Sequence, residues 1–333
     1  MPTDRRVTIY EVAARAEVSI ATVSRVFQGS AKVAAATRER VLAAASALDY
    51  TPSGAAKSLA AKRTNVLGLV LPELGGGYYT ELLSGFDAAA ADLGHSVMLL
   101  LGTDRLSQRV RQLEASVDGI AVVNSSGFVD PAALDHIESN LGLVTIASPA
   151  PAGSVSVAAE SRASAQAITA HLLDHGRRRL RFVGDPTLSF DAGHRYVGFR
   201  NALLAAGMAA ADPIRVSYEA EGAASVARDV LAGRLDADGL VCVNDDVALA
   251  LQFHLRRGGV RVGVDIALTG WDDVPAARLV EPGLTTVVQP VRELGRAAAE
   301  RLVERIQGGP EFAVPLQLLP TTLVVRGSCG CPD

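Results

Sequence analysis

Hydrophobic and polar residues alternate along the chain in two different rhythms. In the first fifty residues apolar positions recur at helical spacing, as in Ile9, Val12, Ala13 and Ala16. From residue 65 onward, short apolar runs such as VLGLVLP, GIAVVNS and GLVCVND are bounded by Gly, Pro, Asn or Asp and separated by amphipathic stretches. The first pattern predicts a small all-α module, and the second predicts βα units with parallel sheets covered by helices.

The βα pattern occurs in two blocks, which predicts two similar lobes with a cleft between them. In open parallel sheets, ligands bind beyond the carboxyl ends of the strands. We therefore expect a two-lobed α/β body that holds a small molecule between its lobes. At 333 residues the chain is long enough for this body and a separate helical module.

The helical module is expected to contain three short helices. Thr8 and Glu11 have the spacing of a capping box, and Ser19 can cap a second helix whose Val23 and Val26 face inward. The outward positions of that helix are Ile20, Ala21, Ser24 and Arg25. The third helix is expected from about Ala35 to Leu48, with Val41, Leu42, Ala45 and Leu48 facing inward. This arrangement suits docking of the second helix in a DNA major groove.

Charge separates the module from the body. Residues 1–63 hold ten basic and five acidic side chains, a net charge of +5, whereas the other 270 residues hold 22 basic and 31 acidic ones, a net charge of −9. A basic module on an acidic body indicates a polyanionic partner for the module, although a merely solvated basic face would have the same charge.

Several classes of protein lack support in the sequence. No apolar run is long enough to span a bilayer and the N-terminus is polar, so we expect a cytoplasmic protein without a membrane partner. There is no G-x-S-x-G, Walker or H-E-x-x-H motif, so no enzymatic activity is expected. Cys242 lies in an apolar run and is interpreted as a core residue. Cys329 and Cys331 form a C-x-C pair with no histidine nearby in the sequence, so we expect neither a metal nor a cofactor.

The run VTIYEVAARAEVSIATVSRVFQG resembles the helix-turn-helix of the LacI/GalR family of transcriptional regulators. The resemblance continues through ERVLAAASALDYTPSGAAKSLAAKRTNVLGLVLP, and GRRRLRFVGDP, CVNDDVALALQ, IALTGWDDVP and LLPTTLVVRGS extend it over nearly the whole chain. It implies a headpiece at residues 1–50, a hinge at 51–64, and a periplasmic-binding-protein-like sensor at 65–333. The N-lobe would comprise about 65–162 and 292–318, and the C-lobe about 163–291 and 319–329.

The resemblance also implies the DNA-contacting residues. Ile20 and Ala21 match positions that contact base edges, and Arg25 matches a groove arginine, which can donate twice to a guanine edge. Thr22 and Ser24 are expected on phosphates, and Thr8 and Ser19 complete the expected set on the headpiece.

The hinge is the expected link between headpiece and sensor. Pro52 ends the third helix, and Ser53 can cap a helix at residues 54–61 that is too short to be stable alone in water. By resemblance its partner is the same helix of a second subunit, and Leu59 is the wedge inserted into the minor groove. We therefore expect a homodimer on a pseudo-palindromic, double-stranded operator.

The effector-binding set follows from the resemblance as well. Arg195 and Asp272 match ligand-binding positions, and Trp271 is interpreted as core. The other expected ligand contacts are Tyr79, Asp191, Tyr218, Asn244 and Gln289. GGGYY at 75–79 and Glu160 depart from the family pattern and are expected at the pocket entrance. At Glu17 the family has a turn glycine or asparagine.

The function implied is a repressor released from its operator by a small sugar-like effector. The alternative within the same family is a purine- or nucleoside-responsive regulator that needs its ligand as a corepressor. The two differ in the sign of the coupling between ligand and DNA.

Overall fold

We describe a computed structural model of the chain, which covers residues 7–27, 32–50, 63–102, 106–124, 127, 129–218, 220–308 and 316–332. The chain divides into two compact units. One comprises the residues up to Val66 together with Ser116–Asp118, and the other comprises Leu67–Ala115 and the chain from Gly119 onward. We refer to them as the headpiece unit and the core unit and describe each by itself.

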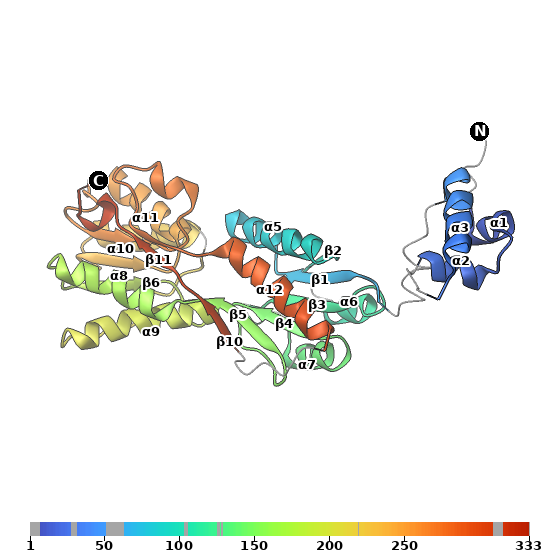
Figure 1. The fold of residues 1–333 in the computed structure, drawn as a ribbon. Coiled ribbons are helices and arrows are strands. Elements are labelled where there is room, and N and C mark those ends of the chain that lie inside the picture. Colours follow the sequence, from blue (N-terminus) through green and yellow to red (C-terminus); the bar gives the residue numbers. More distant parts are fainter. Residues whose placement is uncertain are drawn as a thin grey trace. The chain divides into compact units, whose positions relative to one another are not determined.

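Three helices pack together in the described part of the headpiece unit: α1 (Ile9–Ala16), α2 (Ile20–Phe27) and α3 (Ala35–Ala47) (Figure 1). The buried side chains at their centre are Val12, Ala13, Ala16, Val23, Val26, Val41, Ala44 and Ala45. The expected inward position of Leu42 is wrong, because its side chain is 47% exposed and Ala44 is buried instead. Alanine and leucine surround α3 on several sides, so its sequence defines no single apolar face.

The turn between α1 and α2 is set by local chemistry. The amide and hydroxyl of Thr8 both donate to the Glu11 carboxylate, at 2.7 and 2.9 Å, which fastens the start of α1. Glu17 closes the helix in the left-handed conformation, with φ 55° and ψ 46°. Glycine or asparagine adopts this conformation at lower cost than glutamate. The Ser19 hydroxyl then accepts from the Thr22 amide at 3.2 Å at the start of α2.

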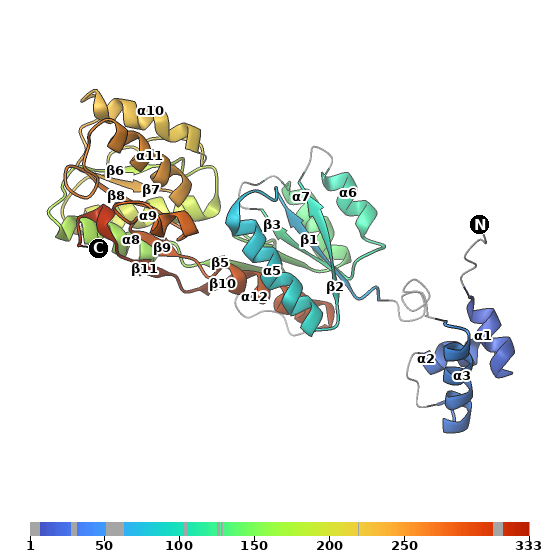
Figure 2. The same cartoon turned by 90° about the horizontal axis from the view of Figure 1, so that it is seen from above.

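The first lobe of the core unit is built on a six-stranded sheet with the order β10-β5-β4-β3-β1-β2. Its strands are β1 (Val66–Leu71), β2 (Ser96–Leu101), β3 (Gly119–Val123), β4 (Leu143–Ile146), β5 (Val155–Ala159) and β10 (Leu316–Leu319). The pairs β1–β3, β3–β4, β4–β5 and β5–β10 are parallel. Helices α5 (Gly76–Asp92) and α12 (Val291–Ile306) cover one face, and Figure 2 shows α6 (Leu106–Leu113) and α7 (Pro131–Asn140) on the other.

Two glycines allow α5 and α12 to pack closely. A Cβ atom on Gly85 would lie 1.9 Å from the carbonyl oxygen of Arg292, and one on Gly295 would lie 2.1 Å from that of Leu82. The two backbones therefore meet where no side chain fits. This contact joins α12, which enters the lobe late in the sequence, to the lobe's first helix.

The second lobe has a smaller parallel sheet, β6-β7-β8, with β6 (Leu180–Val183), β7 (Gly239–Cys242) and β8 (Ala267–Thr269). The antiparallel pair β9 (Thr286–Val288) and β11 (Thr322–Val324) belongs to the same lobe. Helices α8 (Arg162–Asp174) and α9 (Phe190–Ala205) pack together on one side, and α10 (Ala220–Leu231) and α11 (Asp245–Arg257) pack together on the other (Figures 1 and 2). Short 3-10 helices lie at η1 (Pro275–Arg278) and η2 (Gly327–Cys329).

The chain changes lobe between β5 and α8, between β9 and α12, and between β10 and β11. Two of these crossovers are tied together. The Glu160 amide donates to the Leu319 carbonyl at 2.8 Å, and the Thr321 hydroxyl donates to the Glu160 carbonyl at 2.7 Å. The Glu160 carboxylate accepts from the amides of Ala163 and Ser164 and caps α8. Among the helices of the described ranges, none is long and apolar enough to cross a membrane.

Candidate functional site

A cleft of about 1540 Å³ lies between the two lobes of the core unit. From the first lobe it is lined by the segment after β1, including Gly75, Gly77, Tyr78 and Tyr79. From the second lobe it is lined by the start of α9 and by the loops after β7, β8 and β9. The strands thus direct their carboxyl ends toward this space, as expected for a ligand site in parallel sheets.

Every residue that the sequence assigned to the effector lines this cleft: Tyr79, Asp191, Arg195, Tyr218, Asn244, Asp272 and Gln289. They come from six separate segments of the chain. Their convergence is an observation about placement, and their contact with a ligand stays a prediction.

Arg195 is held flat at the base of the cleft. Its guanidinium donates to the Val243 carbonyl at 2.7 Å and lies over the ring of Trp271, 4.5 Å from the ring centre. The residue is 8% exposed, and Trp271, at 2% exposed, packs in the core with Ala165 and Val287. The backbone and ring contacts hold the planar fork in one orientation, so that its free edge can donate to a ligand.

Two carboxyl groups lie beside Arg195, those of the buried Asp191 and the half-buried Asp272. Burial raises the pKa of Asp191, and Arg195 and His194 oppose that rise. Burial also raises the pKa of Asp272 to about 7, with Arg195 opposing the rise and Asp245 adding to it. Gln289 donates to the Asp272 carboxylate. Arg195 and Gln289 therefore place donors on the cleft wall next to the carboxyl groups of Asp191 and Asp272.

The aromatic and amide residues have more varied roles. Tyr78 and Tyr79 meet edge to face with ring centres 5.3 Å apart. The Tyr218 hydroxyl donates to the Asp185 carbonyl at 2.8 Å, so the ring forms a wall of the cleft. The Asn244 amide caps α11 through Val247 and donates to the Tyr218 carbonyl at 2.9 Å. Asn244 therefore shapes the site and retains one donor and one acceptor position for a ligand.

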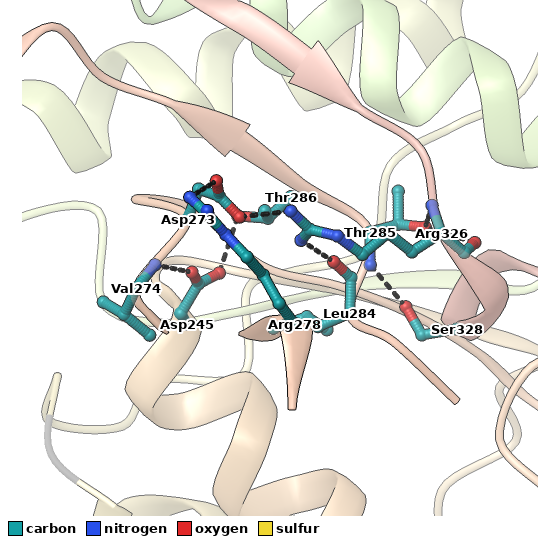
Figure 3. Close-up of polar contacts among 9 residues, drawn as sticks. All are labelled: Asp245, Asp273, Val274, Arg278, Leu284, Thr285, Thr286, Arg326 and Ser328. Atoms are coloured by element: carbon teal, nitrogen blue, oxygen red, sulfur yellow. Dashed lines mark hydrogen bonds and ion pairs between the residues drawn. The ribbon is translucent and has the colours of Figure 1, made fainter. Parts of the chain in front are cut away.

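The loop that carries Asp272 is fixed from below (Figure 3). Asp273 accepts from Arg278 at 2.7 Å and from Arg326 at 2.6 Å. Beneath it, Asp245 accepts from the Thr286 hydroxyl at 2.6 Å and from the Val274 amide at 2.9 Å. Asp272 itself has a φ of 115°, a conformation that costs energy for a residue with a side chain. The network beneath holds it there.

The segment GGGYY, expected at the pocket entrance, contributes Tyr78 to the cleft as well as Tyr79. Other cleft residues escaped the sequence analysis: Ser189, Asp246 and Arg278. Their place in the sequence could have indicated them, because each of these residues lies within a few positions of an assigned cleft residue or on the same loop. The expected place of Glu160 at the pocket entrance is wrong. It lies in a crossover and caps α8, because its carboxylate finds two free helix amides there.

The second helix of the headpiece presents the face expected to contact DNA. Ile20 is 40% exposed, Ala21 and Arg25 are exposed, and Thr22 and Ser24 are half-buried. Val23 and Val26, on the opposite side, are 0% and 4% exposed. The orientation of α2 is thus the one predicted from periodicity, and the base and phosphate contacts remain predictions.

Three hydroxyls of the expected DNA-contacting set, those of Thr8, Ser19 and Thr22, have intramolecular partners. The Thr8 hydroxyl contacts Glu11, and the Ser19 hydroxyl contacts the Thr22 hydroxyl at 2.9 Å. Thr8 and Ser19 also stabilise helix starts. Leu59 and the hinge helix lie outside the described residues.

Comparison with known proteins decides the family. Residues 8–53 match the model of bacterial regulatory proteins of the lacI family, and residues 169–329 match a periplasmic binding protein-like domain. The regulator CelR of Thermobifida fusca is 34% identical over 97% of this chain and 98% of its own length. This chain belongs to the LacI family. It is a DNA-binding transcriptional regulator, and the family is not one of enzymes, in agreement with the sequence analysis.

Other relatives of this LacI-family regulator are repressors with different names. A ribose operon repressor of Halalkalibacterium halodurans is 29% identical over 96% of both chains, and a PurR repressor of Photobacterium profundum is 30% identical over 96% of this chain and 98% of its own. Among solved structures, a CelR–cellobiose complex has a TM-score of 0.72 at 31% identity, covering 97% of this chain and all of that one. A lac repressor dimer bound to operator has a TM-score of 0.83 at 26% identity, covering 98% and 99%.

Proposed function

We propose that this regulator is a repressor that binds a pseudo-palindromic operator as a homodimer and is released by a sugar-like effector in the interlobe cleft. The protein would act in the cytoplasm, on the chromosome. The helix α2 would enter the major groove, with Arg25 reading a base edge and Thr22 and Ser24 on phosphates.

The observation that supports a polyhydroxylated effector is a set of polar side chains that line the cleft and each contain a buried polar atom without a partner among the described residues. The atoms are Oδ1 of Asp191, Nε of Arg195 and Oε1 of Gln289. A buried polar atom without a hydrogen bond is costly. A ligand carrying several hydroxyl groups donates and accepts at once and would offer these side chains hydrogen-bond partners, while the tyrosine rings cover its apolar face.

Two relatives support the sugar class. The CelR structure is a complex with cellobiose, and another relative is a ribose operon repressor. The cleft of about 1540 Å³ exceeds the usual size of a pocket for one small molecule. We therefore favour a glycoside of more than one sugar unit.

The proposed coupling uses the crossovers and the hinge. Closure of the lobes around a ligand would rotate the first lobe, which continues directly into the hinge through β1. A hinge helix of about eight residues is marginal in water, so a small change in the spacing of two hinges would decide whether it forms. Leu59 would be the minor-groove wedge in that state. Such coupling usually has a free energy of about 1–3 kcal/mol, roughly a 5- to 150-fold change in operator affinity.

A second candidate is a purine- or nucleoside-responsive repressor that needs its ligand. The PurR relative and the edge-to-face pair of Tyr78 and Tyr79, which can pack on a base, favour it. In this case the ligand would raise operator affinity instead of lowering it.

The test measures operator affinity of the full chain, by fluorescence anisotropy on DNA from its own upstream region, with and without ligands found by thermal-shift screening of glycosides and nucleosides. A sugar that lowers affinity supports the proposal, and a nucleoside that raises it supports the second candidate. Arg195→Ala should abolish the ligand response without weakening ligand-free DNA binding. Arg200→Ala, on the exposed side of the same helix, is the matched control and should respond normally.

A further inference from the structure

Two histidines and two cysteines lie close together in the second lobe, away from the cleft. His171 lies near the end of α8, and His175 caps that helix. Cys329 ends η2, and Cys331 follows two residues later. The sequence analysis set these cysteines aside because no histidine is near them in the chain, but the fold brings two histidines to them across more than 150 residues.

The distances within the cluster are short. Nε2 of His171 lies 3.2 Å from Sγ of Cys329 and 3.7 Å from Sγ of Cys331. Nε2 of His175 lies 3.2 Å from Sγ of Cys331. The ligand atoms of His171, His175 and Cys331 all lie within 4.8 Å of one another. Sγ of Cys329 lies outside that group of three and donates to the Arg326 carbonyl at 3.1 Å.

Three N–S separations are close to those around one tetrahedral ion. With Zn–N of about 2.0–2.1 Å and Zn–S of about 2.3 Å, a tetrahedral ion holds its nitrogen and sulfur ligands roughly 3.6 Å apart. The three observed N–S distances lie within a few tenths of an ångström of that value.

Nε2 of a neutral imidazole has either one proton or one lone pair, so that atom of His171 can engage only one of the two sulfurs at a time. The Cys329 thiol donates to the Arg326 carbonyl and would turn away from it to join the other three side chains around a cation. The spacing of the two histidines, i and i+4 on one helix face, is a common way to direct two ligands to one ion.

The backbone around the cysteines is fixed independently of any ion. The Ser328 hydroxyl donates to the Leu268 carbonyl at 2.6 Å, and Gly330 adopts a φ of 106°, which suits a glycine between two ligands. Cys329 is fully buried, whereas Cys331 is partly exposed and His175 exposed. An ion can therefore enter from solvent and still be held against a preformed wall.

We propose that His171, His175, Cys329 and Cys331 form a structural Zn²⁺ site that fastens the end of the chain to α8. A set of two imidazoles and two thiolates selects zinc-like ions over Mg²⁺ or Ca²⁺. Binding takes two protons from the thiols to solvent, and the two thiolates then balance the charge of the ion. Four protein ligands leave no open position, so the site would stabilise the second lobe and carry out no chemistry.

The experiment uses the full-length, tag-free chain, reduced and stripped of metal, with Zn²⁺ as the probe. We expect one Zn²⁺ per chain and a rise in Tm of at least about 4 °C at saturation, because the ion binds only the folded state. Co²⁺ should bind in the same place and produce the visible absorption of a tetrahedral site together with a near-ultraviolet thiolate band.

Surface variants make the test specific. His175→Gln and Cys331→Ser should each reduce Zn²⁺ affinity by about 100-fold or more and remove the rise in Tm, whereas His95→Gln, remote from the cluster, should bind like the parent. Zn²⁺ should also protect the partly exposed Cys331 thiol from a thiol reagent in the native protein, whereas Cys242 and Cys329 are buried and should not react in either state. Unchanged stoichiometry in the Cys331→Ser variant, a Co²⁺ spectrum without the thiolate band, or a Cys331 thiol that reacts equally with and without Zn²⁺ would overturn the proposal.

Discussion

Replacing Asp272 by asparagine tests the description of the cleft most sharply. Burial raises the pKa of this carboxyl from 3.8 to about 7. The folded protein therefore holds a proton at pH values where the unfolded chain has released it. By linkage, this group makes folding less favourable as pH rises from about 4 to 7, and its effect is constant above that range. Asp272→Asn keeps the shape and removes the titration.

The magnitude follows from the two pKa values. For a carboxyl with folded and unfolded pKa values of about 7 and 3.8, raising the pH from 5.5 to 8 lowers the free energy of unfolding by about 2 kcal/mol. The stability of Asp272→Asn relative to the parent should therefore be about 2 kcal/mol greater at pH 8 than at pH 5.5. The variant should bind the effector more weakly, because it has lost a charged acceptor.

The assay is urea unfolding of parent and variant at pH 5.5, 7 and 8. Asp265→Asn is the control. Asp265 is exposed, and its hydrogen bonds from Arg261 lower its pKa to about 2, so its ionisation does not change across this range. Its stability difference from the parent should be independent of pH. If the free energies of unfolding of the parent and Asp272→Asn changed in parallel with pH, the raised pKa of Asp272 would be refuted.

Three further predictions concern other parts of the chain. Arg25→Ala should weaken binding to the specific operator by about 1–3 kcal/mol and should weaken binding to random duplex much less. Competition anisotropy measures both affinities, and equal losses for the two DNAs would contradict a base contact of Arg25. Glu17→Asn should slow hydrogen exchange of α1 and α2 amides, stabilising the headpiece by up to about 1 kcal/mol, because asparagine tolerates the left-handed turn; faster exchange would contradict this. Arg326→Ala should lower stability by about 2–3 kcal/mol in urea, since it leaves the buried Asp273 with one partner, and no loss would show that the network in Figure 3 is not stabilising.

Local patterns predicted much of the fold. The spacing of Val23 and Val26 against Ile20 and Arg25 indicates which face of α2 is buried, because a helix repeats every 3.6 residues. The strands were recognisable as apolar runs, since parallel strands are buried on both faces. The buried face of α3 could not be predicted in the same way, because alanine and leucine lie on several sides and contact with α1 decides which are buried.

The candidate sites show the same limit. Arg195 and Asp272 could be assigned from short motifs, but their interaction with Trp271 and Gln289 depends on how separate strands end at one cleft. Nothing local indicates that His175 faces Cys331, because their contact joins positions 156 residues apart. Such clusters arise only when the whole lobe is assembled.

The measurement that tests the central claim most directly is the operator affinity of the full-length chain, by anisotropy on its own upstream DNA over a series of salt concentrations, with and without a cleft ligand. We predict specific binding that weakens steeply with salt, and a sugar-dependent loss of affinity of roughly 5- to 150-fold that Arg195→Ala abolishes. Equal affinity for operator and random duplex, or an affinity that no cleft ligand alters, would contradict it.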